Sequence, residues 1–228
     1  MSVQQLPLAL RYPPDQRLES FVDAPEGVIA HLHALAQVQG ADWLYLAGAT
    51  GTGKTHLALA LCAATEAAGR RAAYLPMIAA SGRLRHALEA LEGNDVVALD
   101  GLEAIAGVRD DEVALFDFHN RARSAGLNVL YTARAAPDAL GLDLPDLRSR
   151  LSQCIRVVLP TPDDESRREI LRDRAQRRGL VLEDAAVDWL LTRTDRDLGS
   201  LVLLLDKLDR ESLAAQRRIT VPFLKQVI

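Results

Sequence analysis

The chain has 228 residues, 49% of them hydrophobic and 25% charged, which is typical of one large globular domain or of a domain with a small companion. Its formal net charge of -4 and pI near 5.8 argue against a protein whose main task is to grip nucleic acid by the phosphates, because such binding needs concentrated lysine and arginine. The two cysteines have no partner at metal-ligand spacing, and no stretch is long enough to cross a bilayer. We therefore expect a soluble cytoplasmic protein with reduced thiols and no membrane contact.

A helix is predicted over residues 28–38, and after it five short apolar runs alternate with longer amphipathic stretches. Strands that are separated by helices of ten or more residues pair in parallel, because the crossover between parallel strands needs that length. The sequence therefore predicts an α/β fold with a parallel five-stranded sheet flanked by helices. The expected strands are Trp43–Ala47, Arg71–Leu75, Val96–Leu99, Asn128–Thr132 and Ile155–Leu159.

The pattern changes at Leu159-Pro160-Thr161-Pro162, where two prolines interrupt the chain and only helical stretches follow. We expect an α/β domain over residues 13–159 and a small all-helical domain over residues 160–228, preceded by an extended tail over residues 1–12. A basic run over residues 172–178 has acids four residues away, which favours a solvated, ion-paired face over a nucleic-acid patch. The expected helices are Asp163–Arg178, Glu183–Arg193, Asp197–Gln216 and a short segment from Val221.

The first apolar run opens directly into the motif G-x-x-x-x-G-K-T, and a helix-like stretch follows it. The glycines of such a loop let its backbone N–H groups turn around a polyphosphate, the lysine reaches the outer phosphates, and the threonine hydroxyl can ligate Mg2+. The helix that follows adds the positive end of its dipole to the same site. The motif predicts a nucleoside di- or triphosphate bound by Gly48, Ala49, Thr50, Gly51, Thr52, Gly53, Lys54 and Thr55.

A second part of this site is predicted where the run over residues 96–99 closes on Asp100, which would hold Mg2+ together with Thr55. Many ATPases of this class carry another acid at the next position, where it polarises the attacking water, but here that residue is Gly101. Nucleotide binding is expected, whereas hydrolysis by the chain itself is left open. Glu103 is either a substitute base or a surface acid in the turn after the strand.

Two arginines are candidates for contacting phosphate from outside the loop. Leu147-Arg148-Ser149-Arg150-Leu151 predicts a short helix before the last strand, from which Arg150 could stabilise negative charge on a phosphate held by a neighbouring subunit. Arg196, in the helical region, could reach back to the chain's own nucleotide. Under the alternative interpretation, Arg148 and Arg150 only make the surface soluble, and Arg196 pairs with an adjacent aspartate.

The order of these features resembles the AAA+ ATPases: the phosphate loop, the Asp100 strand, the Ser-Arg-Leu segment at 149–151, and Asp195-Arg196-Asp197-Leu198. Among them the chain is similar to the bacterial replication initiator DnaA, although a DnaA protein would continue into a helix-turn-helix domain beyond Ile228. The segment from Leu144 to Leu151 and the stretch Ala215-Gln216-Arg217-Arg218-Ile219-Thr220-Val221-Pro222-Phe223 look more like the Hda family of small DnaA-like regulators.

This resemblance implies an AAA+ P-loop NTPase fold with a helical lid, and ADP or ATP with Mg2+ as its cofactor. It also implies that Arg196 is the lid sensor arginine, that Arg150 is an arginine finger acting on a neighbour, and that Phe21 and Val22 lie near the base. Self-association, as a homodimer or a longer array, is expected with it. DnaA-like proteins carry Thr-x-Asp after the fourth strand, whereas this chain reads Thr132-Ala133-Arg134, so Thr132 is expected to be the surviving polar contact there.

Near the N-terminus, Gln5-Leu6-Pro7-Leu8-Ala9-Leu10 resembles the linear peptide by which replication proteins dock on the β sliding clamp. An extended peptide can place Leu6, Leu8 and Leu10 in apolar pockets while Gln5 forms hydrogen bonds at the rim. Pro7 disfavours a helix and keeps the segment extended. The same alternation is also how an edge strand begins.

Together these resemblances imply that the protein docks on the DNA-loaded clamp beside the replisome and presents Arg150 to ATP held by DnaA. The resulting hydrolysis would leave the initiator in its ADP form and prevent re-initiation, with no sequence-specific DNA contact by this chain. Two alternatives are an autonomous AAA+ ATPase of the helicase-loader or transposition-helper type, and a clamp-tethered, nucleotide-gated adaptor that acts on another partner.

Overall fold

The computed structural model describes residues 16–193 and 219–227. Three expectations lie outside these residues: the clamp-binding segment from Gln5 to Leu10, the sensor arginine Arg196, and the helix over Asp197–Gln216.

The five expected strands form one parallel sheet in the order β2-β3-β4-β1-β5. Each strand agrees with the predicted run to within one residue at either end. Strand β1 lies between β4 and β5, since Leu44 is paired with Leu130 on one side and with Ile155 on the other. The carboxyl ends of β1, β3 and β4 therefore meet at one edge of the sheet. The strands are β1 (Leu44–Ala47), β2 (Ala72–Pro76), β3 (Val96–Asp100), β4 (Asn128–Ala133) and β5 (Ile155–Val158).

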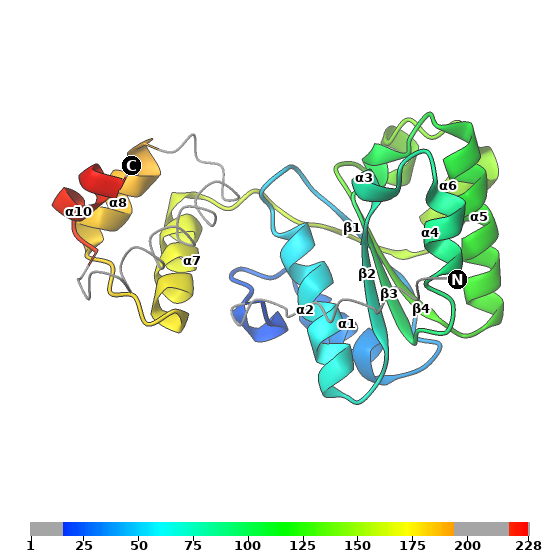
Figure 1. The fold of residues 1–228 in the computed structure, drawn as a ribbon, viewed down its shortest axis with the longest axis horizontal. Coiled ribbons are helices and arrows are strands. Elements are labelled where there is room, and N and C mark those ends of the chain that lie inside the picture. The colour runs from blue at the N-terminus through cyan, green and yellow to red at the C-terminus, as the bar shows by residue number, and fades with distance from the viewer. Residues whose placement is uncertain (1–15, 194–218, 228) are drawn as a thin grey trace, which may run out of the picture.

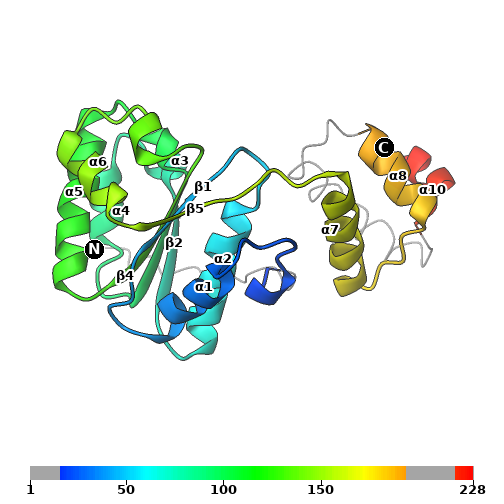
Figure 2. The same ribbon diagram turned by 180° about the vertical axis from the view of Figure 1, so that it is seen from behind.

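Helices cover both faces of this sheet, with α1 and α2 on one face and α4, α5 and α6 on the other (Figures 1 and 2). Successive residues of a strand point to opposite faces, so Leu44 packs toward α1 and α2 whereas Tyr45 packs toward α5 and α6. Strand β1 is apolar throughout because it is buried on both faces. The helices are α1 (Val28–Gln37), α2 (Lys54–Ala67), α3 (Met77–Ala80), α4 (Leu84–Glu89), α5 (Arg109–Ser124) and α6 (Pro145–Ser152), with 3-10 turns η1 (Leu18–Ser20), η2 (Leu102–Ala104) and η3 (Pro137–Ala139).

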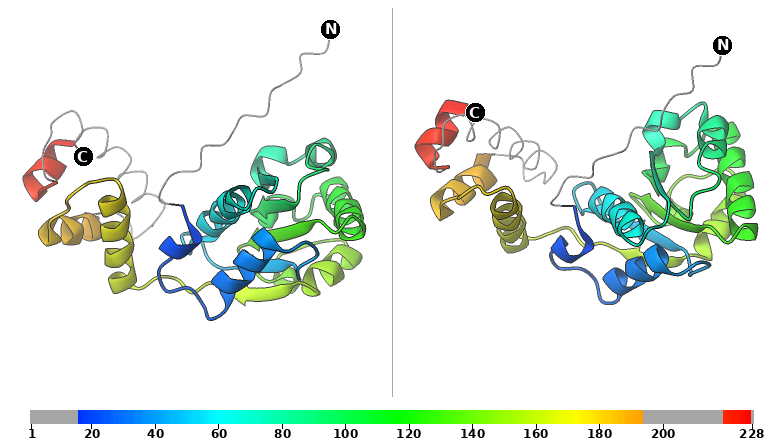
Figure 3. Two further views of the ribbon diagram at one scale, coloured as in Figure 1. Left: turned by 90° about the horizontal axis from the view of Figure 1, so that it is seen from below. Right: turned by 60° about the horizontal axis from the view of Figure 1, so that its bottom comes forward.

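After β5 the chain passes through Pro160 and Pro162 into helices α7 (Asp164–Arg177), α8 (Asp184–Arg193) and α10 (Val221–Val227). These helices lie together to one side of the sheet and its flanking helices, and α7 is nearest to them (Figure 3). They share a small core of their own, which includes Val187 and Leu190 of α8. The carboxylate of Asp163 begins α7 by accepting a hydrogen bond from the Ser166 backbone N–H at 2.8 Å.

The outer surface of α7 is ion-paired, as its charge pattern predicts. Arg168 contacts Asp188 of α8 at 2.9 Å, Arg172 contacts Asp184 at 2.8 Å, and Arg177 contacts Asp173 at 2.7 Å. Within the basic run over residues 172–178, Arg172 and Arg177 are thus paired with carboxylates of the same domain, which agrees with an ion-paired face at these two positions.

Both cysteines are free, with Cys62 buried and Cys154 half-buried. Within the described residues, no cluster of three metal-binding side chains is formed. The helices in this part of the chain are all too short or too polar to span a membrane.

Asn128 joins the first residue of β4 to the end of α1. Its fully buried side-chain amide donates to the carbonyl oxygens of Leu35 and Val38, at 2.7 and 2.6 Å. Asn128→Ala removes both donors from a buried position, so we expect the free energy of unfolding, measured by urea titration, to fall by about 1–3 kcal/mol. The matched control is Gln37→Ala, because Gln37 is exposed in the same helix and its loss should change stability by less than about 0.5 kcal/mol. Equal stability of the two variants would contradict this role of Asn128.

Candidate nucleotide site

The phosphate loop turns between β1 and α2 through backbone conformations that require glycine. Gly51 and Gly53 have φ of 82° and 89°, in the left-handed region. A Cβ on Gly53 would lie 2.5 Å from the Cε2 atom of Phe21, and a Cβ on Gly48 would lie 2.9 Å from the carbonyl oxygen of Leu159. Glycine at these two positions lets the loop pass this close to Phe21 and Leu159, and the turn that it forms is the backbone cradle of the loop.

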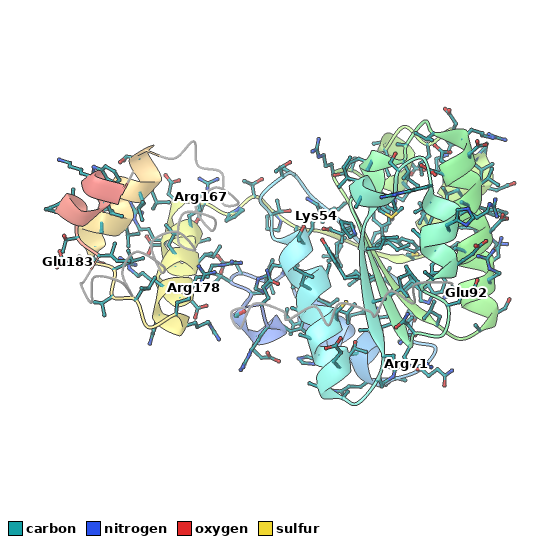
Figure 4. The ribbon with its side chains drawn as sticks, viewed as in Figure 1. Lys54, Arg71, Glu92, Arg167, Arg178 and Glu183 are labelled. Atoms are coloured by element: carbon teal, nitrogen blue, oxygen red, sulfur yellow. The ribbon has the colours of Figure 1, made fainter. Side chains whose placement is uncertain are left out.

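Lys54 begins α2 and is buried beneath this loop. Its ammonium group donates to the carbonyl oxygens of Gly48 and Ala49, at 2.6 and 2.7 Å. Burial lowers the pKa of Lys54, while the nearby carboxylates of Glu103 and Asp100 oppose this change. Figure 4 shows Lys54 at the carboxyl edge of the sheet, far from Arg71 at the opposite edge. Cradle, cation and helix N-terminus together fit the polyphosphate group of a nucleotide.

The Asp100 carboxylate accepts hydrogen bonds from the hydroxyl groups of three residues, which lie on three different elements. Its Oδ2 atom accepts from the hydroxyls of Thr55 and Tyr74, both at 2.8 Å, and its Oδ1 atom accepts from Thr132. Thr55 and Asp100, the two predicted Mg2+ ligands, therefore lie side by side and supply the oxygen atoms that this ion prefers. Thr132 is the polar contact expected after the fourth strand, and its hydroxyl also accepts from the Gly101 N–H at 3.0 Å.

Tyr74 was not identified from the sequence. It lies on β2, and the pairing of Pro76 with Asp100 shows that β2 runs beside β3 in a register that brings this side chain to the site. Burial, together with the charge of Asp100, raises the pKa of Tyr74, so its hydroxyl remains a hydrogen-bond donor.

Glu103 and Arg134 form an ion pair beside the loop. The guanidinium Nε of Arg134 lies 3.1 Å from Glu103 Oε1, and the backbone N–H of Arg134 donates to Oε2, also at 3.1 Å. The Glu103 side chain is 28% exposed and lies in the 3-10 turn η2 after β3, so it is a half-buried carboxylate of that turn, paired with Arg134. Gly101 lies between it and Asp100 with φ of 85°.

A cavity of about 250 Å³ opens between the phosphate loop and α7. Phe21 and Val22, the residues expected near a base, lie in its wall beside Gly53. Two polar residues here, His56 and Arg174, were not identified from the sequence. His56 Nδ1 lies 3.1 Å from Arg174 of α7, and His56 Nε2 lies 3.0 Å from the Arg17 carbonyl oxygen. Both domains therefore line the space next to the loop.

Arg150 lies at the other edge of the sheet, away from the residues just described. It is exposed in the last turn of α6, close to where β1 and β5 begin, and it shares a small cavity with Trp43 and Arg123. No salt bridge to Arg150 is made by any residue that the structure describes. The structure thus brings together the predicted loop residues and Asp100, but it does not bring Arg150 to them.

Beneath Arg150, His119 is buried in an aromatic cluster. Its ring packs edge-on against Trp43 with centroids 4.6 Å apart, and its Nδ1 lies 3.0 Å from the Tyr131 hydroxyl. The guanidinium of Arg123 covers the other part of Trp43, at 5.0 Å from the ring centroid. Burial, and then the charges of Arg123 and Arg150, lower the pKa of His119 to about 4.

Comparison with protein families yields two matches that divide the chain. Residues 6–135 match the family model of IstB-like ATP-binding proteins, and residues 164–228 match the model of the Hda lid domain. The second match falls on the helices that follow β5.

Several solved structures share the fold. Domain III of the Thermotoga maritima replication initiation protein DnaA superposes with a TM-score of 0.76 at 21% identity, over 95% of this chain and 97% of that one. AMPPCP-bound DnaA from Aquifex aeolicus gives 0.65 at 22% identity, over 86% of this chain and 66% of that one, so this chain spans about two thirds of it. The T. maritima RuvB Holliday junction branch migration motor gives 0.66 at 21% identity, over 95% and 71%. This is the AAA+ fold with its parallel sheet and helical lid.

Lys54 provides a direct test of the phosphate cradle. Lys54→Ala removes the cation under the loop, and because charge-assisted hydrogen bonds contribute about 1.5–3 kcal/mol, we expect the Kd for fluorescent ADP to rise roughly ten- to hundredfold. Arg71→Ala is the control, since it removes an exposed cation at the opposite edge of the sheet and should leave the Kd unchanged. Unaltered binding by a folded Lys54→Ala variant would exclude this site.

His119 makes a second prediction, for the pH dependence of stability. Its folded-state pKa near 4 lies below the ordinary value of 6.5, so the unfolded chain takes up the proton first as the pH falls. Stability should be full above about pH 6.5 and should fall between pH 6.5 and 4, by on the order of 3 kcal/mol from this group. Urea titrations should show a smaller decline over this window for His119→Gln. Parallel stability curves for the two proteins would contradict the prediction.

Proposed function

Because the chain belongs to the family of IstB-like ATP-binding proteins and ends in an Hda lid domain, we propose that it is a nucleotide-bound regulator of replication initiation. In this role it docks on the DNA-loaded sliding clamp and stimulates hydrolysis of the ATP that DnaA holds. Re-initiation of chromosome replication is thereby prevented. The DnaA-like fold supports the connection with the initiator.

The chain's own nucleotide, ADP or ATP, is a conformational cofactor in this proposal. Lys54 and the loop N–H groups would bind its phosphates, while Thr55 and Asp100 would hold Mg2+, which neutralises phosphate charge when it is bound. Phe21 and Val22 would contact the base, and Arg196 of the lid would contact the phosphates. The cavity between loop and lid supports this role, because its wall includes residues of both domains.

The position of Arg150 is the observation that carries the proposal. Arg150 is exposed at the edge of the sheet where β1 and β5 begin, whereas the phosphate loop follows the other end of β1. A phosphate that Arg150 meets therefore belongs to another molecule. Its guanidinium would stabilise the negative charge that develops on the transferring phosphoryl group, an effect of roughly 10³- to 10⁵-fold on the rate.

Tethering to the clamp would make this contact efficient. The segment with Gln5, Leu6, Leu8 and Leu10 would bind the clamp as an extended peptide, and DnaA on the same DNA would then be at high effective concentration. Self-association, with a homodimer as the simplest form, would use the same kind of edge that meets DnaA.

The test is a single-turnover measurement of ATP bound beforehand to the cognate DnaA, in the presence of clamp loaded on DNA. We expect the wild-type protein to accelerate the decay and Arg150→Ala to lose at least about a hundredfold of that acceleration while still binding its own nucleotide. Arg109→Ala is the matched control, because Arg109 is also exposed but begins the neighbouring helix α5 at its opposite end.

Two outcomes would contradict the proposal. If wild-type protein binds the clamp but does not accelerate the decay, the chain is a clamp-tethered adaptor for another partner. If Arg150→Ala and Arg109→Ala both act like the wild type, the protein acts on DnaA but Arg150 is not the finger.

A further inference from the structure

Two positions at which this sequence departs from the expected motifs lie beside one carboxylate. Gly101 stands where a second acid was expected, and Arg134 stands where an aspartate was expected, 33 positions further along the chain. In the structure the side chain of Glu103 lies next to both of them.

Glu103 occupies the space beside position 101. Its Oε1 atom lies 3.9 Å from where a Cβ of residue 101 would be, so a carboxylate is present near this position although residue 101 cannot supply one. The left-handed conformation of Gly101, with φ of 85°, turns the chain sharply after Asp100 and lets the 3-10 turn η2 bring Glu103 back toward the strand end.

Glu103 also acts electrostatically on the phosphate site. Among neighbouring charges, its carboxylate has the largest effect in raising the pKa of Lys54, ahead of Asp100, while the charge of Arg134 lowers it. The phosphate loop therefore has a group of four interacting charges beside it. They are the cations Lys54 and Arg134 and the carboxylates Asp100 and Glu103. The formal charges of this group of four sum to zero.

Arg134 restrains Glu103 through two atoms, its guanidinium Nε and its backbone N–H, both at 3.1 Å. The Arg134 side chain is 65% exposed, and pairs of such exposure are screened by water and contribute little to stability. The guanidinium can consequently leave without unfolding the site, and the backbone N–H would then still keep the carboxylate near position 101.

We propose that Glu103 is a general base for hydrolysis of the chain's own ATP and that Arg134 is the latch that keeps it inactive. Released from Arg134, Glu103 accepts the proton of a water molecule whose oxygen bonds to the γ-phosphorus. The bond from that phosphorus to its bridging oxygen breaks, and ADP and inorganic phosphate leave. This activity goes beyond the proposed function, which requires only that the chain hold a nucleotide.

The experiment uses the purified full chain with Mg2+ and ATP, without clamp or DnaA. Arg134→Ala should hydrolyse ATP at least about tenfold faster than the wild type under single-turnover conditions, because it frees the base. Arg134→Ala combined with Glu103→Gln should lose this gain. Arg134→Gln keeps a long polar side chain and should show the same gain in rate. It replaces Arg134→Ala in the experiment if that variant folds poorly. Arg121→Ala, which breaks the exposed pair of Arg121 with Glu92, is the control and should leave the rate unchanged.

Affinity for ATP gives a second readout that does not depend on turnover. Arg134→Ala leaves the group of four with a net negative charge, so the Kd for ATP should rise a few-fold, whereas Glu103→Gln should lower it. The double variant restores neutrality and should return the Kd close to that of the wild type.

The proposal is overturned if Arg134→Ala and Arg134→Gln bind ATP but hydrolyse it no faster than the wild type. It is also overturned if the faster rate survives Glu103→Gln, since the gain would then not come from this carboxylate. Neither result bears on the proposed regulation, because that function is measured on ATP held by DnaA.

Discussion

The carboxylate of Asp100 is the contact on which the carboxyl edge of the sheet depends. It accepts hydrogen bonds from the hydroxyl groups of Thr55 at the start of α2, Tyr74 on β2 and Thr132 on β4. It thereby joins three elements to the end of β3. An acid at this place fixes the position of the loop that precedes α2. The negative charge of Asp100 lies beside that of Glu103, and the cations Lys54 and Arg134 balance both of them.

The parallel sheet keeps the phosphate loop and Arg150 apart. Its strands have four to six residues, so it separates the phosphate loop from the Arg150 edge by roughly 13–20 Å. One molecule thus carries a phosphate site at one edge of the sheet. At the other edge it carries Arg150, which forms no salt bridge with any residue that the structure describes. In the proposed function, the contact of this protein with DnaA is head-to-tail, because the edge that carries Arg150 and the edge that carries a phosphate site are different surfaces.

Local sequence signals were sufficient for the phosphate loop, the strands and the helices, since glycine spacing and apolar periodicity act within a few residues of one another. Tyr74, and the pairing of Glu103 with Arg134, were not predictable in the same way. These contacts join residues 26 and 31 positions apart, and they exist because β2 and β4 flank β3. The composition of a single strand does not indicate which other strands will lie beside it in the sheet. His56 and Arg174 come from two different domains, and no local pattern in the sequence indicates how two domains lie relative to each other.

The short connection from β5 to α7 carries two prolines, Pro160 and Pro162, whose rings fix one backbone angle each. These rings remove two of the rotations through which the helices after the connection could change their orientation relative to the sheet. The cavity beside the loop lies next to this connection, since residues from both sides of it form the cavity wall. A ligand in this cavity would contact both domains at once, so a difference of one phosphate could change the position of the far end of the helical domain. A protein that touches only that end could distinguish the two nucleotide states without contacting the nucleotide.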